Sequence, residues 1–219
     1  MNSNILKNNY ITKAMEFEKE KVCDVYNKIA DRFNQTRGYG WSWIKEFMET
    51  VPKGSLVYDI GCGSGRNMSY PDINFIGVDN CANLLNICGE KGLNVVYGDM
   101  CSLPLKDNSA DFIISIAAFH HLSTIERRIQ ALKELYRVLK PGGKLLISVW
   151  SKNQPKKTRR IFEKYGDIMV KWDQHGEIYD RYYYIFRINE ITQLFNNARF
   201  HIQNYKWDCG NEVFTVIKK

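Results

Sequence analysis

The sequence predicts an α/β protein with a doubly wound, mostly parallel sheet of seven strands, closed by an antiparallel hairpin. Short apolar runs alternate with helical patterns between residues 56 and 150, and this alternation is typical of a parallel sheet with crossover helices. After a final helix at 188–197, two β-rich runs at 199–207 and 212–219 flank Asp208-Cys209-Gly210-Asn211, which predicts a hairpin. We expect one domain over residues 1–219.

A helical extension is expected to precede the sheet, over about residues 1–52. Apolar residues recur at spacings near three and four between residues 14 and 33, which is the period of a helix with one buried face. A second helical stretch covers about 40–50, and Pro52-Lys53-Gly54 then interrupts the chain.

Strands and helices alternate in the central part of the chain. The strands are expected at 56–60, 74–79, 94–97, 111–117 and 144–150, and the helices at 81–91 and 124–139. The strand at 111–117 is rich in apolar residues, so we expect it to be central and buried on both faces. Ser123 and Glu126 have the spacing of a capping box at the start of the second helix, and Pro141-Gly142-Gly143 is expected to end that helix.

Residues 151–187 are interpreted as an irregular excursion, which is longer than an ordinary loop and therefore suggests a functional role. The first part of this segment contains six basic residues and one acidic residue, Glu163. The aromatic residues Phe162, Tyr165 and Trp172 lie among them or follow them. The cations are Lys152, Lys156, Lys157, Arg159, Arg160 and Lys164. A charge run is usually a solvated surface, but this one lies beside the expected mouth of the site. Its position favours a substrate-binding segment that contacts nucleic-acid phosphates.

Composition limits the compartment and the cofactor chemistry. The formal net charge of +7 suits a polyanionic partner without fixing a function. No apolar run approaches the roughly 20 residues of a membrane span, and the polar start MNSNILKNNY has no signal-peptide core. We therefore expect a cytoplasmic or nuclear protein with no membrane partner. The six cysteines include no C-x-x-C pair, so we expect buried, reduced thiols and no metal site.

A glycine-rich loop follows the first strand and carries the strongest functional pattern. Asp59-Ile60-Gly61-Cys62-Gly63-Ser64-Gly65 lies where an open α/β sheet binds its ligand. Asp79 ends the next strand, where an acid can accept hydrogen bonds from both hydroxyls of a ribose, and Asp99 follows the third strand. A dinucleotide-binding dehydrogenase is disfavoured, because its G-x-G-x-x-G motif would need glycine in place of Arg66.

This acid-glycine-acid pattern resembles the class I S-adenosyl-L-methionine-dependent methyltransferases, which share a Rossmann-like fold. The resemblance implies that Asp59 and the loop Gly61, Cys62 and Gly63 hold the methionine end of the cofactor. It also implies that Asp79 binds the ribose. By the same resemblance, Asp99 and Met100 frame the adenine, and Ala117 lies near the transferred methyl group.

Three further segments resemble the eukaryotic tRNA wobble-uridine carboxymethyl methyltransferases, over about residues 22–219. They are Val25 to Arg37, Ser115 to Arg128 with its His-His and Glu-Arg-Arg runs, and Asp180 to Arg187 with its Arg-Tyr-Tyr run. The chain departs from the family at Leu122, where tryptophan is expected, and at Gly38-Tyr39-Gly40 after Arg37.

The second resemblance implies methyl esterification of a carboxymethyl group on a wobble uridine of tRNA. A carboxylate has a pKa of about 4, so it needs no general base at neutral pH, and an arginine fork could orient it. Arg37, Arg127, Arg128 and Arg181 are the candidates; Arg37 could instead hold the carboxylate of the cofactor, and Arg127 or Arg128 could be a surface charge. His120, His121 and Tyr182 are expected to position the substrate, unless they only pack in the core.

The predicted edge strand at 94–97 exposes apolar Val95 and Val96, which is a liability unless something covers it. The resemblance supplies a partner, a small zinc-binding activator protein shared among several methyltransferases, and implies a heterodimer. A homodimer or cover by residues 1–20 are the alternatives. Two other functions stay open: a methyltransferase of quinones, sterols or metabolites, and a binding module without turnover.

Overall fold

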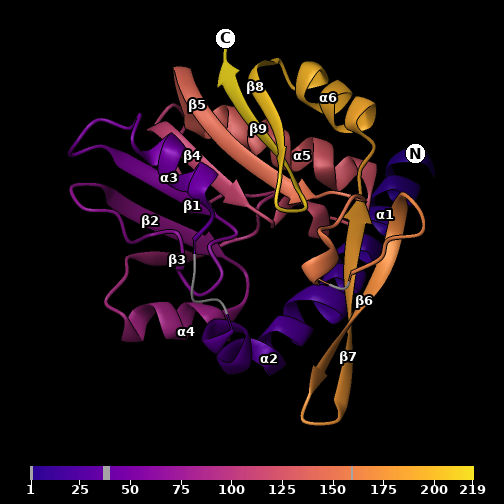
Figure 1. Ribbon diagram of the computed structural model, residues 1–219. Coiled ribbons are helices and arrows are strands. Elements are labelled where there is room, and N and C mark those ends of the chain that lie inside the picture. The colour runs from indigo at the N-terminus through magenta and orange to yellow at the C-terminus, as the bar shows by residue number, and fades with distance from the viewer. Residues whose placement is uncertain (1, 37–39, 159) are drawn as a thin grey trace.

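The computed structural model describes residues 2–36, 40–158 and 160–219 and centres on a seven-stranded sheet (Figure 1). The strand order is β3-β2-β1-β4-β5-β9-β8. The bounds are β1 Leu56–Ile60, β2 Asn74–Asp79, β3 Val95–Tyr97, β4 Ala110–Ile116, β5 Leu139–Trp150, β8 Phe200–Asp208 and β9 Asn211–Lys218. Strands β1 to β5 pair in parallel, whereas β9 is antiparallel to both β5 and β8. The predicted fold class is therefore confirmed.

Two helical layers cover the sheet, because successive residues of a buried strand point to opposite faces. Ile113 packs in the cluster formed with α5 (Ile125–Val138) and α6 (Ile188–Asn197), whereas its neighbour Ile114 packs with α3 (Ser42–Met48). The helix α4 (Ala82–Glu90) joins the second layer beside β3 and packs against α2. The predicted central, doubly buried position of the fourth strand is thus confirmed.

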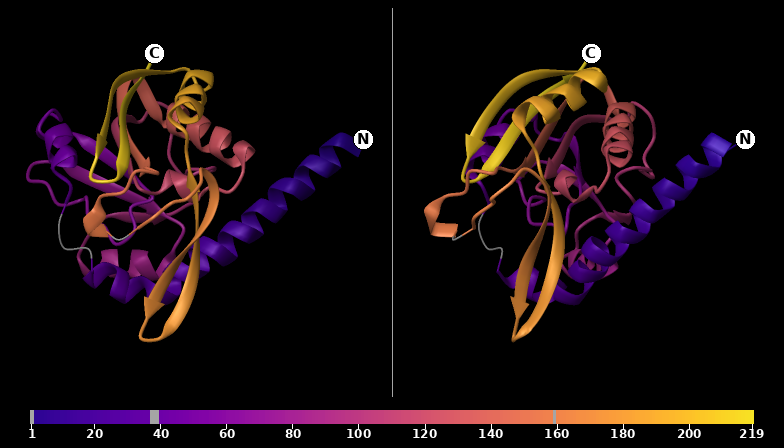
Figure 2. Two further views of the ribbon diagram at one scale, coloured as in Figure 1. Left: turned by 45° about the vertical axis from the view of Figure 1, so that its right-hand side comes forward. Right: turned by 90° about the vertical axis from the view of Figure 1, so that its right-hand side faces the viewer.

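The N-terminal helical segment is longer than predicted and contains a change of helix type. It consists of α1 (Asn2–Glu18), a π-helical turn η1 (Lys19–Cys23) and α2 (Asp24–Gln35). Figure 2 shows α1 as a long helix that extends beyond the body of the protein. Its C-terminal end packs against β7, where the rings of Phe17 and Tyr182 lie 5.2 Å apart.

The prediction that residues 151–187 are irregular is wrong. After a short turn η3 (Lys156–Thr158), this segment forms a separate antiparallel sheet of β6 (Gly166–Gln174) and β7 (Glu177–Ile185). Alternate residues of β6 are exposed, as in a half-buried strand. His175 and Gly176 take positive φ angles of 56° and 91° in the connecting turn, the conformation that hairpin turns favour. Figures 1 and 2 show this hairpin extending away from the main sheet.

Two local predictions at α5 also need correction. Thr124, and not Ser123, is the N-cap, because its Oγ1 accepts a hydrogen bond from the Arg127 backbone N–H at 3.3 Å. The Ser123 side chain instead donates to Glu18. Strand β5 begins at Leu139, directly after the helix, so Pro141-Gly142-Gly143 lies in the first part of that strand. The C-terminal hairpin is as predicted, with positive φ at Cys209 and Gly210.

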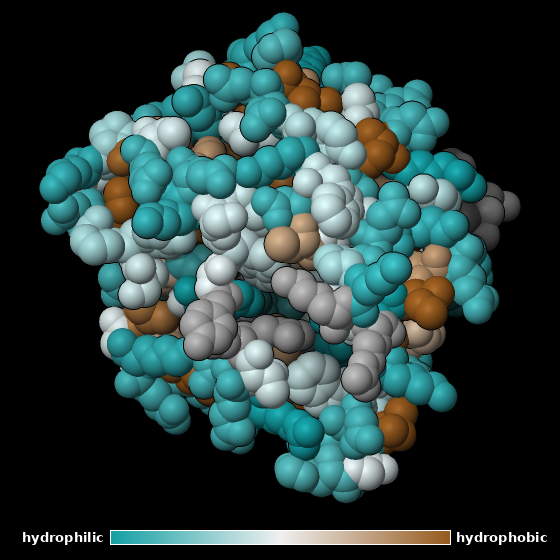
Figure 3. Space-filling model, viewed as in Figure 1, coloured by the Kyte–Doolittle hydropathy of each residue, from teal (hydrophilic) through white to brown (hydrophobic). Residues whose placement is uncertain are grey.

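Hydrophilic residues cover most of the face that Figure 3 shows, and hydrophobic ones are scattered singly among them. In the ranges that the structure describes, no helix combines the length and the apolar character needed to cross a membrane.

Candidate cofactor and acceptor site

A pocket of about 230 Å³ lies at the carboxyl ends of β1, β2 and β4, which is the edge where open α/β sheets bind ligands. The glycine loop forms its floor, and residues from the end of α1, from η1 and from α2 form one wall. The predicted cofactor residues Gly61, Cys62, Gly63, Asp79, Asp99, Met100 and Ala117 all line it. Arg37 lies outside the described residues.

The glycine loop needs residues without side chains. Gly61 and Gly63 take φ angles of +78° and +56°, which glycine adopts without strain. A Cβ on Gly61 would also collide with the Cβ of Ala118. Asp79 fastens this loop to the end of β2, because its two oxygens accept the Gly63 and Cys81 backbone N–H groups at 2.8 and 2.9 Å.

Asp59, the remaining predicted cofactor residue, is fully buried just before this loop and does not itself line the pocket. No cation pairs with its carboxylate among the described residues, and the amide of Asn67 is the one side-chain donor that acts on it. Burial, with the nearby charge of Asp79, raises the pKa of Asp59 well above its ordinary value. A buried carboxyl without an ionic partner is unfavourable for folding, and it fits a site for a cationic ligand group such as an ammonium.

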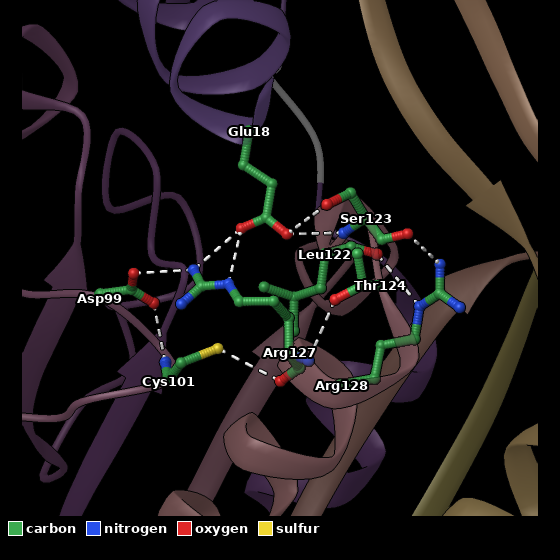
Figure 4. Close-up of polar contacts among 8 residues, drawn as sticks. All are labelled: Glu18, Asp99, Cys101, Leu122, Ser123, Thr124, Arg127 and Arg128. Carbon is green, nitrogen blue, oxygen red and sulfur yellow. Dashed lines mark hydrogen bonds and ion pairs between the residues drawn. The ribbon is translucent and has the colours of Figure 1, made fainter. Parts of the chain in front are cut away.

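At the end of the pocket next to β3, Asp99 and Arg127 meet Glu18 of α1 (Figure 4). Arg127 Nη2 lies 2.7 Å from Asp99 Oδ2 and 2.8 Å from Glu18 Oε2. Arg127 reaches the pocket as predicted, but its guanidinium is already paired with two carboxylates. It is therefore poorly suited to hold the carboxylate of a substrate.

The opposite end of the pocket is built around Ala117 and His121. Ala117 has a positive φ of 54° at the end of β4, a strained conformation of the kind often found at functional sites. His121 Nδ1 lies 2.8 Å from the carbonyl oxygen of Tyr182 and must carry the proton, since a carbonyl only accepts. Its Nε2 then accepts from the Tyr26 hydroxyl at 3.2 Å. Burial and Arg181 lower the pKa of His121 to about 3, so the ring is neutral at pH 7.

Three of the predicted residues lie behind the pocket. His120 is buried, and its Nδ1 accepts the Trp150 backbone N–H at 3.0 Å; burial holds its pKa well below the ordinary range. The Tyr182 hydroxyl contacts Asp167 and Ser123, and Arg128 donates to two carbonyl oxygens. None of the three lines the pocket, and these contacts are those of packed, hydrogen-bonded residues.

Arg181 is a buried cation without an acidic partner in the described part of the chain. Its Nη1 donates to the Tyr26 hydroxyl at 3.3 Å, and its Nε has no acceptor. Its guanidinium lies 4.8 Å from the ring centre of Trp172. Arg181 sits directly behind Tyr26 and Tyr183, which line the pocket, so an anionic group bound there would find this charge nearby.

At this end of the pocket, sequence reasoning missed Trp150 and Tyr183 and expected Arg160 only as a contact to phosphates. Trp150 and Tyr183 stack with ring centres 4.2 Å apart, and the Arg160 guanidinium lies 4.2 Å over the Trp150 ring; all three line the pocket. Trp150 ends the strand next to β4, a position that the strand order could have identified. Glu18 had no local signal, because only the packing of α1 brings it to the pocket.

A family profile described as "Methyltransferase domain" matches residues 58–147. The chain is 36% identical to the tRNA (carboxymethyluridine(34)-5-O)-methyltransferase of Schizosaccharomyces pombe, over 90% of this chain and 96% of that protein. It is 43% identical to mouse tRNA (carboxymethyluridine(34)-5-O)-methyltransferase ALKBH8 over 68% of this chain. The chain spans only 22–36% of the length of that protein and of two mammalian proteins named "Probable tRNA methyltransferase 9B".

Among solved structures, one chain from the complex of the Haloferax volcanii Trm112 methyltransferase activator with a methyltransferase has the same fold. The TM-score is 0.67 at 18% identity, over 90% of this chain and 97% of that chain. At this identity the likeness establishes the fold only.

Proposed function

Because this chain belongs to the tRNA carboxymethyluridine methyltransferase family, we propose that it methylates the carboxylate of a carboxymethyl group on the wobble uridine of tRNA. The observation that carries the proposal is a pocket with a buried acid at one end and a buried cation at the other, neither in an ion pair with a described residue. Asp59, beneath the glycine loop, suits the ammonium of an amino-acid cofactor, and Arg181, behind the acceptor end, suits an anionic acceptor.

The residues present fit S-adenosyl-L-methionine, which supplies an electrophilic methyl group when it is bound. Asp59 and the backbone of Gly61, Cys62 and Gly63 hold the methionine end, where the bare backbone leaves room for close approach. Asp79 accepts the ribose hydroxyls, and its present bonds to two backbone N–H groups keep it in place. Asp99 and Met100 contact the adenine, and Ala117 lies near the methyl group.

The acceptor end favours orientation of an anion over proton transfer. A carboxylate is already ionised at neutral pH, with a pKa of about 4. His121 is a poor base, because its pKa is lowered to about 3. Arg181 and Arg160 instead attract the carboxylate, while His121 and Tyr26 fix the polar wall. Catalysis then depends on orientation and charge in a dry pocket. His120, Tyr182 and Arg127 support this wall from behind or from the other end.

The tRNA substrate and the activator partner are extensions of the proposal. Lys152, Lys156 and Lys164 form no ion pair with described residues and belong to the same segment as Arg160, which lines the pocket, so they are candidates to contact tRNA phosphates. At the β3 edge, Val96 is 39% exposed and Tyr97 is 65% exposed. That exposure leaves a strand edge open for a partner such as the zinc-binding activator.

The test uses the purified full chain, alone and co-expressed with the activator, with radiolabelled S-adenosylmethionine. We expect methyl incorporation into tRNA that carries carboxymethyluridine and none into the same tRNA lacking that modification. Nucleoside mass spectrometry should detect the methyl ester, and mild alkali should remove it. Methylation of quinones, sterols or small metabolites with inert modified tRNA would contradict the proposal.

A further inference from the structure

Glu18 connects the N-terminal helix to the cofactor pocket through a buried set of charges (Figure 4). Its carboxylate accepts four hydrogen bonds: from Ser123 N at 2.6 Å, Ser123 Oγ at 2.8 Å, Arg127 Nε at 3.0 Å and Arg127 Nη2 at 2.8 Å. The same Nη2 donates to Asp99 Oδ2 at 2.7 Å. One guanidinium therefore bridges a carboxylate at the end of α1 and another that follows β3.

This group of charges contains one more carboxylate than is needed to hold α1 against the rest of the protein. Two carboxylates share one guanidinium, and the Glu18 and Arg127 side chains are only 10% and 8% exposed. A second acid adds desolvation cost to a buried ion pair, so one acid fewer would be enough to hold the helix. Glu18, Asp99 and Arg127 all line the pocket. The additional carboxylate, Asp99, is therefore available to accept hydrogen bonds from a bound ligand.

Glu18 also controls how Asp99 is presented. Arg127 turns Nε–H and one Nη2–H toward Glu18, which leaves one Nη2–H for Asp99. The other oxygen of Asp99 accepts the Cys101 backbone N–H at 2.8 Å. Each Asp99 oxygen thus accepts one N–H group and keeps room for a further donor. Without Glu18, Arg127 could turn two N–H groups onto Asp99 in a bidentate pair and occupy that room.

The π-helical turn η1 explains how one helix reaches the pocket at two points. A π-turn closes i→i+5 hydrogen bonds, so residues five apart lie on nearly the same side. Glu18 and Cys23 have this spacing, and both line the pocket. In a regular α-helix, residues five apart would diverge by more than a third of a turn.

We infer that Glu18 is a positioning residue for the adenine of the cofactor, which holds Arg127 so that Asp99 stays open to the exocyclic amino group. The inference rests on the proposed function, because it takes S-adenosylmethionine as the ligand. It makes the docking of α1 and the binding of cofactor mutually dependent, since binding linkage is reciprocal.

The experiment measures calorimetric binding of S-adenosylhomocysteine to the full chain. Glu18→Gln should weaken binding about tenfold, because it loses a charge-assisted hydrogen bond. The matched control Glu16→Gln, an exposed position on the same helix, should stay within about twofold. The analogue with hypoxanthine in place of adenine has no amino group, so the wild type should discriminate against it, and Glu18→Gln should lose most of that discrimination. S-adenosylhomocysteine should also slow hydrogen exchange of α1 in the wild type and in Glu16→Gln, but not in Glu18→Gln.

A second variant covers the case in which Glu18→Gln does not fold. Ser123→Ala removes only the Oγ donor to Glu18 and should weaken binding of S-adenosylhomocysteine by about fivefold. The inference is overturned if the folded variants lose stability but keep wild-type affinity and base discrimination, since Glu18 would then only fasten the helix. A wild-type chain that does not bind S-adenosylhomocysteine contradicts the proposed function and the inference with it.

Discussion

At the scale of single residues, Asp59 and Arg181 set the character of the site. Each is buried, and neither has an ionic partner in the described part of the chain. Burying an isolated charge opposes folding, so these residues weaken the fold on their own account. Asp59 lies under the glycine loop and Arg181 lies behind Tyr26 and Tyr183. Ligand groups of opposite charge bound at these two positions would offset the cost of burying them.

We predict that Asp59→Asn raises the stability of the cofactor-free chain at neutral pH and weakens S-adenosylhomocysteine binding about tenfold or more. Burial raises the pKa of Asp59, so the folded chain keeps a proton that the unfolded chain releases above about pH 4. The stability from this group is complete below that pH and falls as pH rises through the folded pKa. Asparagine has no proton to release, so the decline should be smaller in the variant.

Thermal unfolding at pH 5 and pH 8, with calorimetry at both pH values, measures this effect. The matched control is Asp111→Asn, which removes an exposed ion pair with Lys140 and should alter neither property by much. A destabilised Asp59→Asn chain with wild-type affinity for S-adenosylhomocysteine would assign Asp59 to the fold instead of the cofactor.

We predict that Arg181→Met separates stability from activity. Removing a buried cation without an acidic partner should leave the melting temperature unchanged or higher. The kcat/KM for modified tRNA should fall about 100-fold, because the charge that attracts the carboxylate is absent. Affinity for S-adenosylhomocysteine should stay the same. Steady-state kinetics and thermal unfolding test this, and normal kcat/KM in Arg181→Met would exclude Arg181 from the acceptor site.

At the scale of elements, the β6–β7 hairpin and the segment before it supply residues to one end of the pocket. From β7 the hairpin brings Tyr183 into the pocket lining and Arg181 to a position behind it, while Arg160, which also lines the pocket, precedes β6. The chain therefore inserts a small second sheet between β5 and α6, and this insertion supplies residues to the site that the main sheet does not.

We predict that replacing Lys152, Lys156 and Lys164 by alanine weakens tRNA binding and flattens its salt dependence. The slope should fall by a little under one for each phosphate that the variant no longer neutralises. Affinity for S-adenosylhomocysteine should not change. Filter binding at several salt concentrations measures the slope. The control triple variant is Lys53→Ala, Lys106→Ala and Lys140→Ala, at the amino ends of the parallel strands and thus opposite the pocket. Equal slopes for both variants would make the basic segment a solvated surface.

At the scale of the whole molecule, the two sheet edges differ. β8 closes one side as the outer strand of a long hairpin, whereas β3 is a strand of three residues with exposed Val96 and Tyr97. The β3 edge is followed directly by the loop that carries Asp99 and Met100. A partner at this edge would therefore stiffen a wall of the cofactor pocket.

We predict that Val95→Lys with Val96→Glu abolishes co-elution with the activator in size-exclusion chromatography, because charges at a paired edge disrupt strand addition. The control places the same charges on the other edge, as His201→Lys with Gln203→Glu, both exposed on β8. Co-elution of the Val95, Val96 variant would move the interface elsewhere. A fully active monomer that ignores the activator would remove the partner from the proposal.

The sequence by itself determined the main sheet and the cofactor loop, because both are written in local patterns. Strand and helix periods, glycine at the loop and acids at strand ends depend on neighbours along the chain. Strand β6 also has the alternating pattern of a half-buried strand. Its charged residues made that pattern difficult to recognise from the sequence.

The tertiary structure alone decided which charges are paired. Arg127 and Arg181 are equivalent candidates in the sequence, yet Arg127 meets Glu18, 109 residues away, whereas Arg181 is left without an acid in the described part of the chain. Pairing over such separations depends on how α1 turns at η1 and where β7 packs. No local pattern encodes those contacts, because they follow from the burial of whole elements.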